Sequence, residues 1–356
     1  MLIENKIMLL KRLVNDNISE LKLNNLQQKM KTQVVKKLDD DVYQFENIKC
    51  PICDKNDKEC IGEKDRYGLS YTTNICTECG LIYTDPRMNQ SSYNEFYNTE
   101  YRKLYVGKER ATEAFFNAQK NKGEKIYSYL KENNLIKKEC FVLEIGCGAG
   151  GILEIFRNKG HKVKGSDLGQ EYIEYGIKNH GLDLELGFLS DINLKQKPDI
   201  IIYSHVLEHI LDLNTELQTI KKSITKDTIV YIEVPGLKEI HKNYESNILK
   251  YFQNAHTFHF TLETLTNLFS KNGFELICGN QFVQSAFRLT NKVIPIKSDH
   301  KEVREYIIQN EKRRVFYPFT LFGLKYYSNK VVLKILKFTK LKALAGKFKN
   351  ALAGKK

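Results

Sequence analysis

The stretch from Phe141 to Gly151 carries the clearest chemical signal in the chain. It reads Phe-Val-Leu-Glu-Ile-Gly-Cys-Gly-Ala-Gly-Gly, an apolar run that ends in an acid and leads into a glycine-rich turn. Glycines keep such a turn free of side chains that would obstruct a ligand. The N-terminus of the following helix would offer unpaired N–H groups to an anionic or carboxylate-bearing ligand. A glycine-rich turn alone is a weak indication, because many α/β proteins contain one for packing reasons.

Four cysteines form a second group with chemical potential. Cys50 and Cys53 make one Cys-x-x-Cys pair, and Cys76 and Cys79 make another. Four thiolates at this spacing can hold a tetrahedral Zn²⁺ in a zinc ribbon. We expect a closed structural site that stabilises a small domain, rather than one that contacts substrate. The other cysteines are scattered and residues 1–15 do not resemble a secretory signal, which favours reduced thiols in the cytoplasm.

Two acids follow apparent strands downstream of the glycines. Asp167 comes after a strand expected at 161–166, and Asp191 comes shortly after another at 182–186. Asp167 lies about twenty residues beyond the glycines, the offset at which a carboxylate can accept hydrogen bonds from both hydroxyls of a bound ribose. We therefore expect Asp167 to belong to a nucleoside-binding site.

Alternating strands and helices must position these residues. Further strands are expected at 199–203 and 228–234, and helices at 170–180 and 213–224. This alternation predicts an α/β fold with a doubly wound, mostly parallel sheet that binds its ligand at the carboxyl ends of the strands.

Over residues 110–280 the chain resembles the class I S-adenosylmethionine-dependent methyltransferases. The resemblance implies a Rossmann-like sheet of seven strands and S-adenosylmethionine as the cofactor. A nicotinamide-binding fold would instead begin Gly-x-Gly-x-x-Gly, without the preceding acid. The first motif of the family, an acid followed by Gly-x-Gly-x-Gly, is matched by Glu144, Gly146, Gly148 and Gly150, its ribose acid by Asp167 and its adenine-contacting acid by Asp191.

The zinc ribbon ahead of this region resembles the arrangement in bacterial methyltransferases of sugar and surface-polysaccharide biosynthesis. Some of these methylate nucleotide-linked sugars at carbon, and a Tyr-x-Glu-His stretch supplies their base. Only its final His has a match here, at His256, because Gln253, Asn254 and Ala255 occupy the preceding positions. The resemblance thus implies a sugar acceptor, nucleotide-linked or lipid-linked, and leaves O-, N- and C-methylation open.

Two histidines are candidates for the catalytic base. His256 is the first choice, and His205, directly after the fourth expected strand, is the second. A histidine in either place could instead serve packing or the cofactor site. Some members of the family that methylate catechol-type oxygens bind a divalent metal through acids in the region of Glu208 and His209. His205 occupies one such place here, so we expect Glu208 and His209 to orient the following helix and to pair with the core.

The length of 356 residues, with 42% hydrophobic composition, suits one full-sized core with smaller appendages. Tyr97, Tyr101 and Tyr105 are spaced to share one helix face, either for packing or for closing over a ligand. The expected divisions are a helical extension at 1–40, a zinc ribbon at 45–90, a helical linker or lid at 91–135, the methyltransferase domain at 136–295 and a basic helical tail at 296–356.

The positive charge is concentrated in the tail. The formal net charge is +13, and residues 312–356 contain thirteen Lys and Arg and no acid, so residues 1–311 balance to zero. Within 341–352, apolar residues recur at helical spacing among lysines. Such a basic amphipathic helix suits an anionic membrane surface, and a helix docked on its own protein fits equally well.

Three functions are compatible with these patterns. The first is a cytoplasmic sugar methyltransferase, with or without contact to the inner face of the membrane through residues 312–356. The second is an RNA methyltransferase that holds RNA with the zinc ribbon, although the neutral balance of residues 1–311 argues against nucleic-acid binding. The third is a non-enzymatic interaction protein, which the intact cofactor motif disfavours. The sequence does not indicate an oligomeric state.

Overall fold

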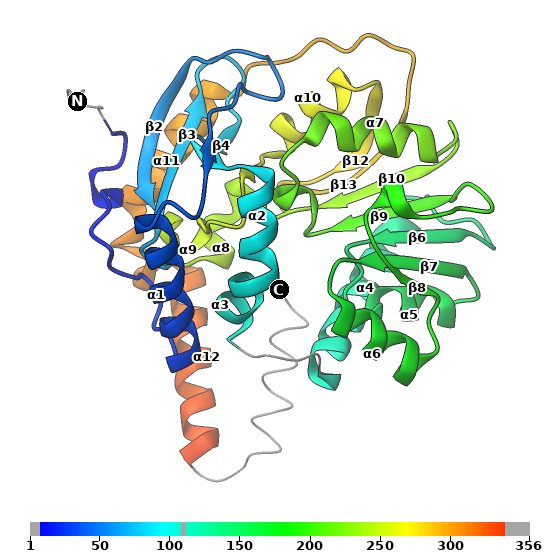
Figure 1. Cartoon of the computed structure of the whole chain (residues 1–356), viewed down its shortest axis with the longest axis horizontal. Helices are drawn as coiled ribbons and strands as arrows, with labels where there is room; N and C mark the ends of the chain where they lie inside the picture. The colour runs from blue at the N-terminus through cyan, green and yellow to red at the C-terminus, as the bar shows by residue number, and fades with distance from the viewer. Residues whose placement is uncertain (1–7, 108–111, 339–356) are drawn as a thin grey trace.

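Two sheets organise the protein in this computed structural model, which describes residues 8–107 and 112–338 (Figure 1). A seven-stranded sheet forms one side of the molecule and a four-stranded sheet lies toward the other (Figure 1), and β1 (Phe45–Glu46) pairs with β5 (Arg87–Met88). The strands of the large sheet are β6 (Phe141–Ile145), β7 (Lys162–Asp167), β8 (Leu184–Leu186), β9 (Ile200–Ser204), β10 (Ile229–Glu233), β12 (Phe274–Gly279) and β13 (Gln284–Leu289).

The large sheet is doubly wound. Its strand order is β12-β13-β10-β9-β6-β7-β8, and only β13 runs antiparallel to its neighbours. The chain moves from β6 toward β7 on one side and later returns to β9 on the other. This reversal creates the topological switch point at which open α/β sheets bind ligands. The predicted mostly parallel Rossmann-like sheet is therefore confirmed.

Helices cover both faces of this sheet because its side chains alternate between two apolar layers. Val142 packs in the cluster with Phe116 and Phe156, whereas its neighbour Leu143 packs in the cluster with Leu217. One face carries α4 (Glu113–Glu132), α5 (Gly151–Asn158) and α6 (Gln170–His180), and the other carries α7 (Leu213–Ser223) and α10 (Leu262–Lys271) (Figure 1).

The cysteine-bearing sheet is antiparallel and joins the large domain directly. It consists of β2 (Lys58–Lys64), β3 (Ser70–Cys76), β4 (Ile82–Thr84) and β11 (Phe258–His259), in the order β11-β4-β3-β2. Strand β11 comes from the part of the chain that follows β10. The small antiparallel sheet therefore includes a strand from the region that forms the large sheet. The two regions also share a hydrophobic core, in which Leu81 and Tyr83 pack with Phe269 of α10.

The N-terminal region is helical over a shorter range than predicted. Helix α1 spans Asn25–Asp39 and begins with a capping box between Asn24 and Gln27. Residues 8–24 instead run beside β2, where Leu10 N–H donates to the carbonyl of Ile61, with one 3₁₀ turn (Lys11–Leu13). The prediction of a helix is wrong for residues 8–24, because Leu10 and Leu13 are buried in the cluster that contains Ile61 of β2 rather than along a helix.

The segment between the two sheets contains the predicted tyrosine row. It runs as α2 (Gln90–Phe96), a π-helical turn (Tyr97–Tyr101) and α3 (Arg102–Val106). The rings of Tyr97 and Tyr101 stack at 4.2 Å between centroids, and those of Tyr101 and Tyr105 at 5.7 Å. These tyrosines therefore lie on one face of the helical segment.

The described part of the tail is helical. Helix α11 (His300–Arg314) buries Val303 and Ile307 near α8 (Ile240–Asn243) and α9 (Ile248–Tyr251), whereas α12 (Leu321–Phe338) extends from the body of the protein (Figure 1). The amphipathic pattern at 341–352 lies outside the described residues, so membrane contact there stays a prediction. Among the helices of residues 8–107 and 112–338, none is long and apolar enough to cross a membrane.

Candidate active site

The glycine-rich turn connects β6 to α5 at the carboxyl edge of the sheet. Gly146 has φ +69° and Gly148 has φ +54°, conformations that side-chain-bearing residues rarely adopt. A Cβ on Gly146 would lie 2.3 Å from Val206, and one on Gly148 would lie 2.7 Å from the Gln119 side chain. The turn therefore depends on glycine both for its backbone shape and for its approach to neighbouring elements.

Asp167 lies at the end of β7 and faces this turn. Its Oδ2 accepts from Gly148 N–H at 2.8 Å, and its Oδ1 accepts from Gly169 N–H at 2.7 Å. Arg102 of α3 approaches Oδ1 at 3.4 Å. Asp167 Oδ2 has a further lone pair, so the geometry suits a residue that also accepts from a ligand hydroxyl.

Glu144 lies in β6 just before the turn and is almost fully buried. Burial raises the pKa of its carboxyl group well above the usual range. Its Oε2 has no hydrogen-bond partner. A buried carboxyl oxygen of this kind is available to a polar or cationic group of a ligand.

Asp191 occupies a different environment. It is exposed, and its Oδ2 accepts from the backbone N–H of Phe188 at 2.9 Å, which closes a short 3₁₀ turn (Leu189–Asp191). Gly150, the last glycine of the motif, has φ +80° and is the N-cap residue of α5. The structure thus gathers Glu144, Gly146, Gly148, Gly150 and Asp167 at one edge of the sheet, with Asp191 after the adjacent strand β8.

His205 directly follows β9 and lies between two carboxylates. Its Nδ1 is 3.4 Å from Glu208, and its Nε2 is 3.7 Å from Glu233 at the end of β10. Burial and the charge of Lys122 oppose protonation of the imidazole, but the two carboxylates outweigh them and raise the pKa of His205. Burial alone would raise the pKa of Glu233. His205 and Lys122 outweigh this effect and lower the pKa of Glu233 to about 2.

His256 lies close to the same group from another part of the chain. Its Nε2 is 3.9 Å from Glu208 and contacts the side-chain amide of Gln253. The ring of His209 meets it edge to face at 4.6 Å between centroids. Burial lowers the pKa of His209 and places that of His256 well below its usual range, so both imidazoles are neutral at physiological pH.

The cysteine-bearing sheet and the adjacent α2 hold the segment that carries His256. Tyr71 of β3 donates its hydroxyl to the carbonyl of His256, and Tyr93 of α2 donates to the carbonyl of Ala255 at 2.6 Å. Thr84 N–H donates to the carbonyl of Thr257 at 2.9 Å. The position of His256 therefore depends on residues more than 160 positions earlier in the chain.

The four cysteines meet as their spacing predicts. Cys50 Sγ and Cys79 Sγ are 3.4 Å apart, as are those of Cys53 and Cys76. Bonds of about 2.3 Å to a tetrahedral zinc would separate sulfurs by about 3.8 Å, so this cluster fits Zn²⁺ with small adjustments. Hydrogen bonds from Cys50 and Cys79 lower the pKa of Cys76, which favours its thiolate form.

Several site residues have no motif that reveals them. Gln119 of α4 donates to the carbonyl of Cys147 at 2.9 Å and so spans the glycine turn. Arg102 of α3 likewise approaches Asp167. Tyr97, whose Oη lies 2.6 Å from His209 Nδ1, belongs to the tyrosine row that the sequence indicates. Glu233 could have been found from the sequence, because it lies at the end of a predicted strand, where α/β sheets bind their ligands.

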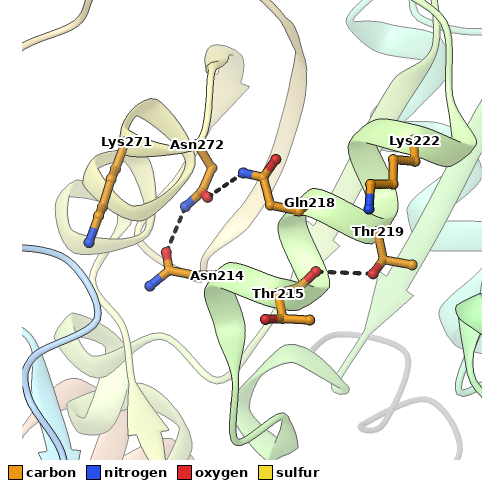
Figure 2. A pocket seen from close by; sticks show the side chains of 7 residues that line it. All are labelled: Asn214, Thr215, Gln218, Thr219, Lys222, Lys271 and Asn272. Atoms are coloured by element: carbon orange, nitrogen blue, oxygen red, sulfur yellow. Dashed lines mark hydrogen bonds between the residues drawn. The ribbon is translucent and has the colours of Figure 1, made fainter.

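A separate hollow of about 520 Å³ lies between α7 and α10, away from these residues (Figure 2). Its side chains bond to one another: Gln218 donates to Asn272, and Asn272 donates to Asn214. None of the predicted cofactor-binding or catalytic residues lines it. It is a polar surface recess rather than part of the candidate active site.

Comparisons with known proteins agree with this geometry. A family profile described as a methyltransferase domain matches residues 108–278. An uncharacterized methyltransferase of Staphylococcus carnosus (strain TM300) is 26% identical over 131 residues, which cover 36% of this chain and 62% of that protein. The C-methyltransferase NovU of Streptomyces niveus is 26% identical over 143 residues, 38% of this chain and 33% of that protein. The chain thus spans less than two thirds of either relative.

Solved structures overlap the chain more loosely. A S-adenosylmethionine-dependent methyltransferase from Clostridium acetobutylicum shares 15% identity at a TM-score of 0.39, covering 56% of this chain and 99% of that one. The profile match coincides with the glycine turn, Asp167 and the doubly wound sheet. Residues 108–278 of this chain therefore form a class I S-adenosylmethionine-dependent methyltransferase domain.

Proposed function

We propose that the protein transfers a methyl group from S-adenosylmethionine to a sugar that is part of a nucleotide-linked or lipid-linked glycan precursor. The observation that carries this proposal is the placement of His256 and His205 around Glu208, beside the cofactor-binding edge of the sheet. S-adenosylmethionine supplies an electrophilic methyl group on a sulfonium centre. A hydroxyl or carbon acceptor must lose a proton during the transfer, and these histidines are the candidate bases.

The residues at the carboxyl edge have distinct roles in this proposal. Asp167 accepts from the ribose hydroxyls, and Asp191 contacts the adenine. The glycine turn and the N-terminus of α5 accommodate the methionine portion, whose amino group Glu144 can bind through its unpartnered oxygen. Correct alignment of the acceptor with the methyl group then supplies much of the rate enhancement.

A small polar acceptor fits the surroundings of His256 and His209 better than RNA does. Tyr97 and Tyr101 offer ring faces next to His209, at 5.7 Å between ring centroids for each tyrosine. Apolar faces with a few converging polar groups are typical of small-molecule sites. RNA binding would instead require a basic face, whereas residues 1–311 carry no net charge.

Carbon methylation is a second candidate, supported by the similarity to a protein named as a C-methyltransferase. The Tyr-x-Glu stretch is absent before His256, but a carboxylate and a phenol come close from other segments. Glu208 lies 3.9 Å from His256, and Tyr97 Oη lies 2.6 Å from His209. These groups could assist removal of a proton from an activated carbon.

The acceptor class can be identified by labelling. Zinc-replete protein is incubated with methyl-labelled S-adenosylmethionine and with separate pools of nucleotide-linked sugars, lipid-linked sugars and RNA. We expect label in a sugar pool, because residues 1–311 carry no net charge that would favour RNA. Nuclear magnetic resonance of the product distinguishes an O-methyl from a C-methyl group. Label confined to RNA would overturn the sugar proposal.

Replacing Asp167 tests the cofactor site. Asp167→Asn should weaken S-adenosylmethionine binding about 10–100-fold, because charge-assisted hydrogen bonds contribute roughly 1.5–3 kcal/mol. Isothermal titration calorimetry measures the change, and Asp183→Asn, at an exposed aspartate of the same region, is the matched control. Equal affinity in Asp167→Asn and wild-type protein would exclude the proposed ribose contact.

We also propose that Cys50, Cys53, Cys76 and Cys79 hold a structural Zn²⁺. Cys76→Ala should release the zinc and lower the melting temperature markedly, since structural Zn²⁺ contributes ~10–16 kcal/mol in small zinc-dependent domains. Cys60→Ala, at a buried cysteine of β2, should keep the zinc and change stability far less. Elemental analysis and thermal unfolding check both variants. Cys76→Ala protein with a full complement of zinc would contradict the assignment.

A further inference from the structure

Glu208 is a buried carboxylate whose oxygens lack hydrogen-bond donors. The residue is 1% exposed, and neither Oε1 nor Oε2 has a hydrogen-bond partner. It lies in a 3₁₀ turn (Leu207–His209) directly after β9. A carboxylate removed from water without donors is costly unless a cation compensates its charge. The expectation that Glu208 merely orients the following helix does not account for its placement.

His256 presents an unprotonated ring nitrogen to the same region, and a metal ion there would replace the Gln253 amide that donates to it. Arg66 donates to the side-chain oxygen of Gln253, which fixes the orientation of that amide. The NH₂ group of Gln253 therefore faces His256 Nε2, and an amide NH₂ can only donate. His256 Nε2 is thus the unprotonated nitrogen of its ring.

His209 is held in a form that also suits a ligand. Its Nδ1 lies 2.8 Å from the carbonyl of Ala255, which can only accept, so Nδ1 carries the proton. Nε2 then keeps its lone pair. Histidines that bind metals commonly donate their other ring N–H to a backbone carbonyl in this way, which fixes both tautomer and ring orientation.

We propose that Glu208, His209 and His256 form a binding site for a divalent transition-metal ion such as Mn²⁺, Fe²⁺ or Zn²⁺. One ligand atom from each residue lies within 4.8 Å of the others. Metal bonds of about 2.0–2.2 Å require donors roughly 3–4 Å apart, so small side-chain movements complete the site. Two imidazoles and one carboxylate favour transition metals over Mg²⁺ and Ca²⁺, which prefer oxygen donors.

Such an ion would extend the proposed function. As a Lewis acid it could bind an oxygen of the acceptor and hold the acceptor beside the methyl donor, a use that rests on the proposed methyl transfer. His256 would then be a ligand, and the role of base would pass to His205. The binding of the ion itself depends only on the three residues and is tested without cofactor or acceptor.

The competing arrangement pairs Glu208 with protonated His205, whose Nδ1 lies 3.4 Å away. In that arrangement the imidazolium neutralises the carboxylate and no ion binds. The two arrangements predict opposite results when a metal is offered, because only the first has an affinity for Mn²⁺ that depends on His209.

The test titrates full-length protein that holds one Zn²⁺ per chain, from which any second Zn²⁺ has been removed, with Mn²⁺ and follows free Mn²⁺ by electron paramagnetic resonance. Mn²⁺ competes poorly with Zn²⁺ for thiolates, so the cysteine cluster does not interfere. We expect one Mn²⁺ per chain, and at least tenfold weaker binding in Glu208→Gln and in His209→Asn. Glu239→Gln, at a buried carboxylate elsewhere, is the matched control and should bind Mn²⁺ as wild-type protein does.

Two results would overturn the proposal: wild-type protein that leaves all Mn²⁺ free at millimolar concentration, or Glu208→Gln protein that binds Mn²⁺ as tightly as wild-type. Circular dichroism and zinc content show whether each variant is folded. If Glu208→Gln fails to fold, His209→Asn decides the matter. Calorimetry with S-adenosylmethionine on the same preparations separates a failure of this metal site from a failure of the proposed methyltransferase function.

Discussion

The arrangement of the candidate active site depends on the antiparallel pairing of β4 with β11. Phe258 pairs with Tyr83 and His259 with Ile82, so a strand of the cysteine-bearing sheet fixes the segment that begins at Gln253. Buried Asp65 adds to this by accepting from Asn254 N–H at 3.0 Å. The cysteine cluster is therefore coupled to the methyltransferase domain through backbone hydrogen bonds and a common apolar core. Loss of order in the small sheet would displace His256 relative to Asp167 and the glycine turn, the proposed cofactor-binding edge.

Electrostatics shape the other side of the site. Glu233 and Glu208 lie on either side of His205, and while no metal ion is bound they together favour its imidazolium form. Folding raises the pKa of His205. The pairing therefore contributes its full stabilisation below the pKa that His205 has in the unfolded chain, and this contribution is lost as the pH rises through the pKa that it has in the folded protein. A base must be unprotonated to accept a proton, so His205 gains basic capacity as the pH rises, whereas His256 stays neutral because it is buried.

Local patterns predicted the sheet and its glycine turn well because both depend on neighbouring residues. Strand–turn–helix alternation and the spacing of Glu144, Gly148 and Asp167 are visible in the sequence. Gln119 and Arg102 could not be found in this way, since each reaches the site from a helix without any motif. The helical extension expected before Asn25 was wrong for residues 8–24, because Leu10 and Leu13 fit an extended chain packed on β2. The Tyr-x-Glu stretch is missing before His256. The carboxylate of Glu208 and the phenol of Tyr97 come close to the histidines only in the folded protein.

Hydrogen–deuterium exchange with and without a zinc chelator tests the coupling of the two sheets most directly. The account predicts that amides of residues 82–84 and 256–260 are protected together in zinc-loaded protein and lose protection together after chelation. Amides of Ile200–Ser204, in the middle of the large sheet, should stay protected after chelation. Protection of residues 256–260 that survives while residues 82–84 exchange freely would contradict the claim that the pairing of β4 with β11 positions His256.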